Sequence, residues 1–230
     1  MKDGRSGEVS ARETVLAGIR RSLGVTGGEA PRRFEVERRL AEAPAGIVPQ
    51  RGQGDLPARV ATFRAEAERA QATVAEAAAL NDVPAEVARF LREANCPATV
   101  RMGTDPRLAA LPWPATALDV SIGPSDGRDL NAVSMALVGI AETGTLALVS
   151  GADNPTTLNF LPDNAIVVVR REDVVADYEA AFARLRAVYG KGGAPRALNF
   201  ITGPSRSADI EQTLLLGAHG PRRLHIVIAG

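Results

Sequence analysis

The chain has few of the residues that hold metals or form disulfides. It contains one cysteine, Cys96, and two histidines, His219 and His225. A single cysteine excludes an internal disulfide, a cysteine-ligated zinc site and a cysteine-bound iron–sulfur cluster within this chain. Two histidines exclude a multi-histidine metal site. The sequence therefore predicts no metal and no redox cofactor in this chain.

The chain also has no net charge and no long apolar run. Its 27 Lys and Arg balance 27 Asp and Glu, which argues against a nucleic-acid-binding protein with a strong positive field. No stretch reaches the ~20 apolar residues of a membrane span, and residues 165–169 are followed by Arg170 and Arg171. The first residues carry both charge signs and no apolar core, unlike a secretory signal. We expect a cytoplasmic protein with no membrane span and no nucleic-acid partner.

The 230 residues, 45% of them hydrophobic, are typical of one large domain with an appendage. An apolar stripe at Val15, Leu16, Ile19 and Leu23 predicts a helix that ends at Gly24. Residues 24–57 are rich in Gly, Pro and Arg without a sustained period, which predicts an extended arm. We therefore expect an N-terminal helix and arm over residues 1–57 and an α/β domain over residues 58–230.

The second part of the chain alternates between helical and strand-like segments. The strands expected to be central are apolar on both faces, as in a sheet covered by helices on both sides. Strand–helix alternation over residues 165–229 favours parallel pairing with right-handed crossovers. The sequence therefore predicts a three-layer α/β/α fold with a mostly parallel sheet. Helices are predicted over 58–80, 84–95, 173–189 and 208–216, and strands over 98–102, 145–150, 165–170, 197–202 and 224–229.

A loop after the strand at 197–202 contains the first group of candidate site residues. In an open parallel sheet, ligands bind beyond the carboxyl ends of the strands, where loops lead into helix N-termini. Here glycine permits a close approach, serine can cap the following helix, and the arginine adds donors, a combination that suits a phosphate or carboxylate. The alternative is a well-capped helix whose arginine pairs with a neighbouring acid. The candidate anion-binding residues are Gly203, Ser205, Arg206, Ser207 and Asp209.

Two further segments contain residues suited to catalysis or binding. Glu142, Thr143 and Gly144 lie on a sharp turn that enters a strand. Glu142 is a candidate nucleophile or base if burial raises its pKa, and it is equally a candidate to accept backbone N–H groups and hold the turn. His219, between two glycines, is a candidate general acid or base or a turn residue. His225 lies within an apolar strand and is predicted to be a satisfied core residue.

Three motifs together resemble the LUD (lactate utilisation) domain family. They are Ala141–Thr145 (AETGT), Gly203–Glu211 (GPSRSADIE) and Gly217–Pro221 (GAHGP), and the resemblance extends from about Ala58 to Gly230. It implies a core similar to that of sugar-phosphate isomerases and CoA transferases. It also implies a role in L-lactate oxidation beside partner proteins that carry iron–sulfur clusters. The expected function is a non-redox component of that system, which binds a small carboxylate, another anion such as phosphate, or partner subunits.

The sequence departs from the family pattern at two positions and leaves an enzymatic alternative open. Ala165 stands where the family usually has histidine, and Ser207 stands where threonine is more usual. The alternative is a stand-alone acyl-transfer enzyme, by analogy with CoA transferases on a similar core. In that reaction Glu142 would attack an acyl thioester, Arg206 would hold the acid, and His219 would assist proton transfer.

Overall fold

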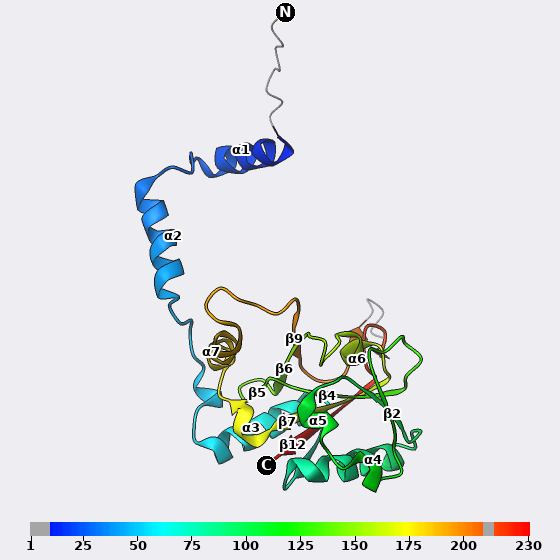
Figure 1. Cartoon of the computed structure of the whole chain (residues 1–230). Coiled ribbons are helices and arrows are strands. Elements are labelled where there is room, and N and C mark those ends of the chain that lie inside the picture. Colours follow the sequence, from blue (N-terminus) through cyan, green and yellow to red (C-terminus); the bar gives the residue numbers. More distant parts are fainter. Residues whose placement is uncertain (1–9, 209–213) are drawn as a thin grey trace, which may run out of the picture. The chain divides into compact units, whose positions relative to one another are not determined.

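The computed structural model describes residues 10–208 and 214–230 of the chain. The chain divides into two compact units, Met1–Gly46 and Ile47–Gly230. No helix in the described part combines the length and the apolar character that a membrane crossing requires. The candidate site residues that the structure describes all belong to the second unit (Figure 1).

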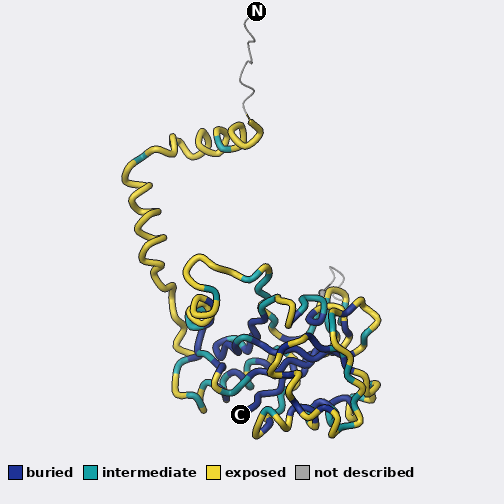
Figure 2. Tube along the Cα trace, in the orientation of Figure 1, coloured by how far each residue is buried: buried dark blue, intermediate teal, exposed yellow. Residues whose placement is uncertain are grey.

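The first unit contains two helices rather than one. Helix α1 spans Ala11–Leu23, where a helix was predicted. Helix α2, Ala30–Glu42, lies within the stretch predicted to be an extended arm. Proline in its first turn is compatible with a helix start, and Arg38 forms ion pairs with Glu35 and Glu42 one turn to either side. Neither helix has a buried residue, as the yellow tube in Figure 2 shows.

A six-stranded parallel sheet forms the centre of the second unit. The strand order β1-β12-β7-β4-β2-β3 and the exclusively parallel pairing confirm the predicted fold class. Strand β7 is buried on both faces of the sheet, as the sequence predicted. Ile166 and Val168 pack into one core cluster, whereas Val167 and Val169 pack into the cluster on the other face. The strands are β1 (Thr73–Ala77), β2 (Thr99–Met102), β3 (Asp119–Ile122), β4 (Asn131–Met135), β7 (Asn164–Arg170) and β12 (Arg223–Ala229).

Helices cover both faces of this sheet, and a second sheet joins them on one face. Helices α4 (Val83–Glu93) and α5 (Pro106–Ala109) supply side chains to the core cluster on the first face. Helix α3 (Leu56–Arg69) and the second sheet supply the cluster on the other face, and α7 (Tyr178–Tyr189) packs on the outer side of that sheet. The second sheet has the order β8-β5-β6-β9, with bounds Val174–Val175, Val138–Ile140, Thr145–Val149 and Leu198–Ile201.

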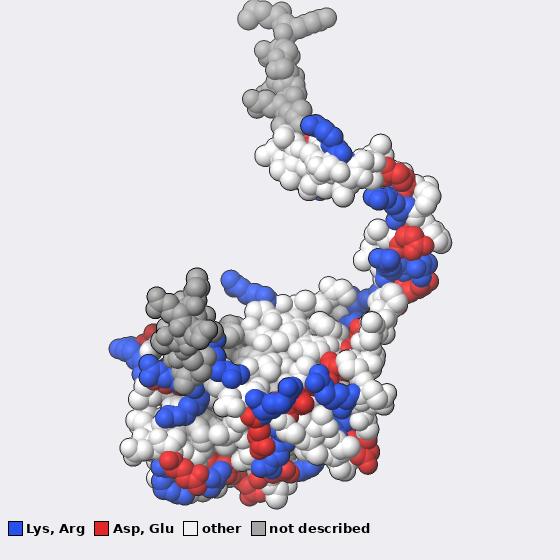
Figure 3. Space-filling model, turned by 180° about the vertical axis from the view of Figure 1, so that it is seen from behind, with Lys and Arg blue, Asp and Glu red and all other residues white. Residues whose placement is uncertain are grey.

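Short elements connect these layers. They are α6 (Thr157–Phe160), the β10–β11 hairpin (Arg206–Ala208 and Leu214–Leu216), and the 3-10 turns η1 (Gln50–Gly52), η2 (Leu80–Asp82), η3 (Trp113–Ala115) and η4 (Arg171–Asp173). Acidic and basic side chains are interspersed over the surface of the second unit seen in Figure 3. That mixture agrees with the balanced charge of the chain and shows no field of one sign on this face.

Two helix predictions were wrong because tertiary pairing overrides local composition. The helix predicted over residues 58–80 ends at Arg69, Gln71 takes a left-handed φ of 72°, and β1 then pairs with β12. The helix predicted over residues 208–216 has strands at both described ends, because β10 and β11 pair antiparallel. Its middle, including Asp209, lies outside the described residues.

Two further boundaries in this half of the chain also differ from the prediction. The strand predicted over 197–202 exists as β9, but it pairs antiparallel with β6 in the second sheet. The helix predicted from residue 173 begins only at Tyr178, after η4 and β8, because Asp177 is its N-cap. The central sheet therefore passes directly from β7 to β12, with the intervening elements placed in the outer layers.

The core position predicted for His225 is confirmed. Its side chain is 2% exposed, and its ring stacks on Phe90 with centroids 4.1 Å apart. Nε2 lies 3.1 Å from Oε1 of Glu86, and Nδ1 lies 2.8 Å from Oγ1 of Thr73. Burial lowers the pKa of His225, and the neighbouring Glu86 carboxylate opposes that effect only in part.

The lowered pKa of His225 predicts a stability that falls on mild acidification. The unfolded chain binds the proton more readily, so the contribution is complete above the unfolded pKa of ~6.5 and is lost as pH decreases through the folded pKa. Urea unfolding between pH 7.5 and 5.5 should show this slope, and His225→Gln should flatten it. Equal slopes for the two proteins would contradict the assignment.

Candidate functional site

Four hydroxyl groups meet where the AETGT turn joins the end of β9. Thr143 Oγ1 lies 2.7 Å from Thr145 Oγ1, which lies 2.6 Å from Thr202 Oγ1. The Tyr178 hydroxyl donates to Thr145 at 3.3 Å and accepts from Thr143 at 3.5 Å. Thr145 is fully buried, Thr143 and Tyr178 are half-buried, and Thr202 is exposed. This hydroxyl cluster (Thr143, Thr145, Thr202 and Tyr178) therefore extends from the core to the surface.

The two motif glycines hold this cluster against the end of α3. Gly144 has φ +64°, and a Cβ there would overlap the backbone nitrogen of Ala67. Gly203 has φ +70°, and a Cβ there would overlap the carbonyl oxygen of Ala70. Both positions combine a left-handed backbone with a backbone contact that tolerates no side chain. The role of these glycines in the structure is to let two turns pack side by side on one helix end.

Glu142 belongs to the same turn but faces a different element. It is 4% exposed, and its Oε1 accepts the backbone N–H of Tyr178 at 3.2 Å, in the first turn of α7. Its own N–H donates to the carbonyl oxygen of Ala176 at 3.1 Å. A carboxylate at a helix N-terminus satisfies an otherwise unpaired amide and interacts favourably with the helix dipole. Of the two roles predicted for Glu142, the geometry supports the holding of the turn.

The predicted placement of the Ser205 loop at the carboxyl ends of the parallel strands is wrong. The Ser205 N–H donates to the carbonyl oxygen of Pro221 at 2.8 Å, just before β12 begins, so the loop lies at the amino edge of the sheet. The Ser205 carbonyl oxygen accepts from Gly217, and its hydroxyl accepts from the His219 N–H at 3.3 Å. The protein's own groups therefore use the polar groups of Ser205, and Arg206–Ala208 form a strand rather than open a helix.

The structure nevertheless places most of the candidate residues in one region. Arg206 is exposed, and its guanidinium donates to the carbonyl oxygen of Ala70 at 3.1 Å, the same residue that Gly203 contacts. His219 is exposed and is linked to Ser205. The end of β9 and the loop after it thus connect the hydroxyl cluster to His219. This connection consists of Thr202, Gly203, Ser205 and Arg206. Ser207 lies in β10 opposite Leu215, and Asp209 is outside the described residues.

Sequence reasoning did not assign roles to three members of the hydroxyl cluster. Thr145 is part of the AETGT motif, Thr202 ends the strand predicted over 197–202, and Tyr178 lies within the helix predicted over 173–189. The available signal was the pairing of a hydroxyl residue with each motif glycine, Thr143 and Thr145 around Gly144 and Thr202 before Gly203. Tyr178 becomes visible only in three dimensions, where Phe200 packs edge-on against its ring at 5.3 Å.

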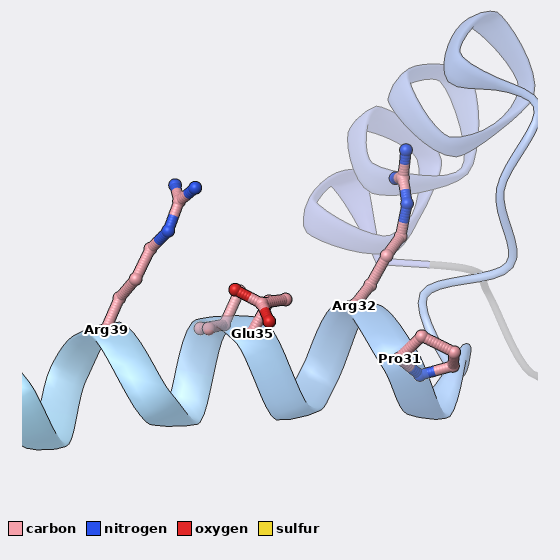
Figure 4. Close-up of a pocket in the computed structure, with 5 residues that line it drawn as sticks. Pro31, Arg32, Glu35 and Arg39 are labelled. Carbon is pink, nitrogen blue, oxygen red and sulfur yellow. The ribbon is translucent and has the colours of Figure 1, made fainter.

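A hollow on helix α2 is less suited to hold a ligand. A 580 Å³ hollow on α2 is lined by Pro31, Arg32, Glu35, Val36 and Arg39, and Figure 4 shows Arg32 and Arg39 projecting from the same side of the helix. All five are exposed residues of a single helix, so nothing fixes a ligand there. Within the described ranges, no cluster of three or more His, Cys, Asp or Glu side chains is arranged to hold a metal ion.

Comparison with known proteins finds relatives of this chain. Residues 131–229 match the LUD domain model. "Lactate utilization protein C" of Geobacillus kaustophilus (strain HTA426) is 39% identical over 126 residues, which cover 50% of this chain and 52% of that protein. The protein of the same name from Bacillus subtilis (strain 168) is 36% identical over 90 residues, covering 39% of this chain and 38% of that protein. The chain thus spans about half the length, or less, of these curated relatives.

A solved structure shares the fold over a longer stretch. The crystal structure of a DUF162 family protein from Deinococcus radiodurans superposes with a TM-score of 0.57 at 23% identity. The match covers 77% of this chain and 100% of that one. Residues 131–229, which match the LUD domain model, include Glu142, the hydroxyl cluster, Arg206 and His219. The resemblance predicted from the three motifs is confirmed, because residues 131–229 match the LUD domain model and the relatives are named lactate utilization protein C.

Proposed function

We propose that this chain is a non-redox component of an L-lactate utilisation system and that it binds a small carboxylate beside the hydroxyl cluster. The LUD domain and the relatives named lactate utilization protein C support the pathway. Oxidation of lactate to pyruvate releases an electron pair, and a chain with one cysteine has no cluster to accept it. Iron–sulfur partner proteins would take that role, and this chain would handle the acid or the assembly.

The Thr145–Thr202 hydrogen bond of 2.6 Å is the observation that carries the binding proposal, because it joins the two motif turns into one surface. On that surface Thr202 and the Arg206 guanidinium are both exposed. Arginine recognises a carboxylate through its fork of donors, and hydroxyl groups can both donate to and accept from a 2-hydroxy acid. The contact between Arg206 and Ala70 holds the guanidinium at the end of α3.

Titration calorimetry of the full chain with L-lactate, acetate and inorganic phosphate tests the proposed site. We expect L-lactate to bind more tightly than acetate, and Arg206→Gln to weaken the binding at least ~10-fold, because a charge-assisted pair contributes about 1.5–3 kcal/mol. Thr202→Val should weaken it less. Arg128→Gln is a matched control, since Arg128 is an exposed arginine on a different loop, paired with Asp126. Unchanged affinity in Arg206→Gln and Thr202→Val would remove this site.

Growth on L-lactate tests the pathway independently of the site. In an organism with no second lactate route, deletion of the gene should abolish that growth, and the wild-type chain should restore it. The proposal expects Arg206→Gln to restore growth poorly while Arg128→Gln restores it fully. Normal growth of the deletion strain would contradict a role in lactate utilisation, whatever the calorimetry shows.

The alternative of an acyl-transfer enzyme makes a prediction about Glu142. Its carboxylate is buried and accepts the Tyr178 amide, so it is poorly placed to attack a thioester. We expect mass spectrometry to find no covalent adduct after incubation with acyl-CoAs. Glu142→Ala should instead lower the free energy of unfolding by about 1–2 kcal/mol, as loss of a helix cap does, and Glu142→Gln by less. A wild-type adduct that Glu142→Gln abolishes would restore the enzymatic alternative.

A further inference from the structure

The two helices of the N-terminal unit expose most of their large apolar side chains. Neither α1 nor α2 contains a buried residue, as Figure 2 shows. Contiguous exposed apolar surface marks an interaction site, whereas singly scattered residues do not. The side chains that are 49–70% exposed are Val15, Ile19 and Leu23 on α1, and Phe34, Val36 and Leu40 on α2.

Local interactions at both ends nevertheless specify α1 as a helix. Ser10 and Glu13 form a reciprocal capping box, and Gly24 ends the helix with a left-handed backbone. A helix of 13 residues is marginally stable in water on its own, because most helical stability in proteins comes from the packing of an apolar face. The described part of a single chain leaves that face of α1 exposed, so packing against another helix would stabilise it.

The apolar residues of α1 have the spacing of a helix-pairing surface. Leu16, Ile19 and Leu23 recur at intervals of three and four residues, as in the seam between two paired helices. Val15 lies one turn before Ile19 and widens the seam. We call these four residues the apolar stripe. Its spacing favours another helix as the partner of α1.

The charges beside the apolar stripe fit a second copy of the same helix. Glu13 and Arg20 are both exposed, and because they are seven residues apart they lie on one flank of the stripe. In an antiparallel pair that packs Leu16 of each copy against Ile19 of the other, Glu13 comes within ~3 Å along the axis of the level of Arg20 of the second copy. The two-fold symmetry repeats this contact, so self-pairing creates two ion pairs and opposes the two helix dipoles.

The exposed area of the two helices is sufficient for a specific dimer. Side chains exposed to this extent each keep roughly 100 Å² of apolar surface, so the six residues provide roughly 600 Å² per copy. Specific interfaces bury about 600–1,000 Å² per partner. Residues 1–46 contain nine Lys and Arg and seven Asp and Glu, so net charge does not keep two copies apart.

We propose that two copies of this chain associate through their N-terminal units. The α1 helices pack antiparallel along the apolar stripe, Glu13 of each copy pairs with Arg20 of the other, and the exposed side chains of α2 extend the interface. The N-terminal unit is then an assembly element that joins two copies of the second unit. The proposal does not depend on lactate binding, because all of these residues lie outside residues 131–229.

Sedimentation equilibrium of the full chain over a wide range of concentration tests the proposal. We expect a monomer–dimer equilibrium that Ile19→Glu abolishes, because this change places a charge within the apolar stripe. Glutamate has a higher helix propensity than isoleucine, so the variant does not weaken α1 itself. Val188→Glu is the matched control, since Val188 is 59% exposed on α7, and it should associate like the wild type. A monomeric wild type, a dimer that survives Ile19→Glu, or a dimer that Val188→Glu also abolishes would overturn the proposal.

Charge reversal tests the antiparallel contact between Glu13 and Arg20. Arg20→Glu and Glu13→Arg should each weaken self-association at least ~10-fold, because each brings like charges together. An equimolar mixture of the two variants should form a mixed dimer, since the arginines of one then meet the glutamates of the other. Glu13→Gln keeps a capping-box residue and measures the effect of losing the charge alone. Failure of the mixture to associate would overturn the antiparallel arrangement, and it is the result expected if α1 packs on its own chain or on a different protein.

Discussion

Replacement of Gly144 by alanine is expected to lower the free energy of unfolding by about 2–5 kcal/mol. The left-handed backbone alone disfavours an L side chain by about 1–2 kcal/mol. The added Cβ would also overlap the backbone of Glu66 and Ala67, which cannot rotate away as a side chain can. Overpacking of that kind costs about 1–3 kcal/mol more. Chemical denaturation followed by circular dichroism measures the loss.

Gly127→Ala is the matched control for this prediction. Gly127 also has a positive φ, +90°, but nothing lies within 4 Å of the Cβ that alanine would add. Its replacement should cost only the backbone term, about 1–2 kcal/mol. If the two variants lose the same stability, the contact with α3 does not explain the glycine at position 144. A larger loss in Gly144→Ala would also predict weaker lactate binding, because Thr143 and Thr145 flank that residue.

Asp173→Ala, which removes a buried carboxylate, is expected to lower the free energy of unfolding by about 2–3 kcal/mol. Asp173 is 2% exposed, and its two oxygens accept from Arg170 at 2.7 Å and from Arg184 at 2.5 Å. These arginines belong to the end of β7 and to α7, so one carboxylate connects the central sheet to the outer helix. Both guanidiniums are partly exposed, which places the estimate below that for a fully buried pair.

The exposed pair of Asp126 and Arg128 provides the comparison. Both side chains are largely in solvent, where water and salt screen their attraction. Asp126→Ala should therefore leave the free energy of unfolding almost unchanged. Asp173→Asn should fall between the two alanine variants, because it keeps one acceptor oxygen. Similar losses at both aspartates would mean that burial does not strengthen the Asp173 contacts.

Much of the fold could be predicted because its signals are local and strong. The run at 166–169 is apolar at every position, which is typical of a strand buried on both faces. The helix that became α4 has apolar residues at helical spacing and a proline compatible with its first turn. The three motifs indicated the similarity to the LUD domain because their residue types and order are specific, even though their contacts were unknown.

The site could be predicted only in part, because its contacts join residues far apart in the chain. Thr145 and Thr202 are separated by 57 positions, and the Glu142 carboxylate reaches an amide 36 positions away. The Ser205 loop resembled a helix start, since serine, arginine and aspartate are common there. Its antiparallel pairing with a later strand determined a different geometry.

The sequence by itself determined the α/β class, the buried central strands and the similarity to the LUD domain, because hydrophobic periodicity and motif order depend on residues close together in the chain. The tertiary structure alone decided that Glu142 faces a helix end, that the Ser205 loop lies at the amino edge, and that four hydroxyls meet where the AETGT turn joins the end of β9. The physical reason is that a polar side chain can pair with any donor or acceptor that the fold brings within hydrogen-bond distance. The choice among those partners is made by packing between layers, which no local pattern specifies.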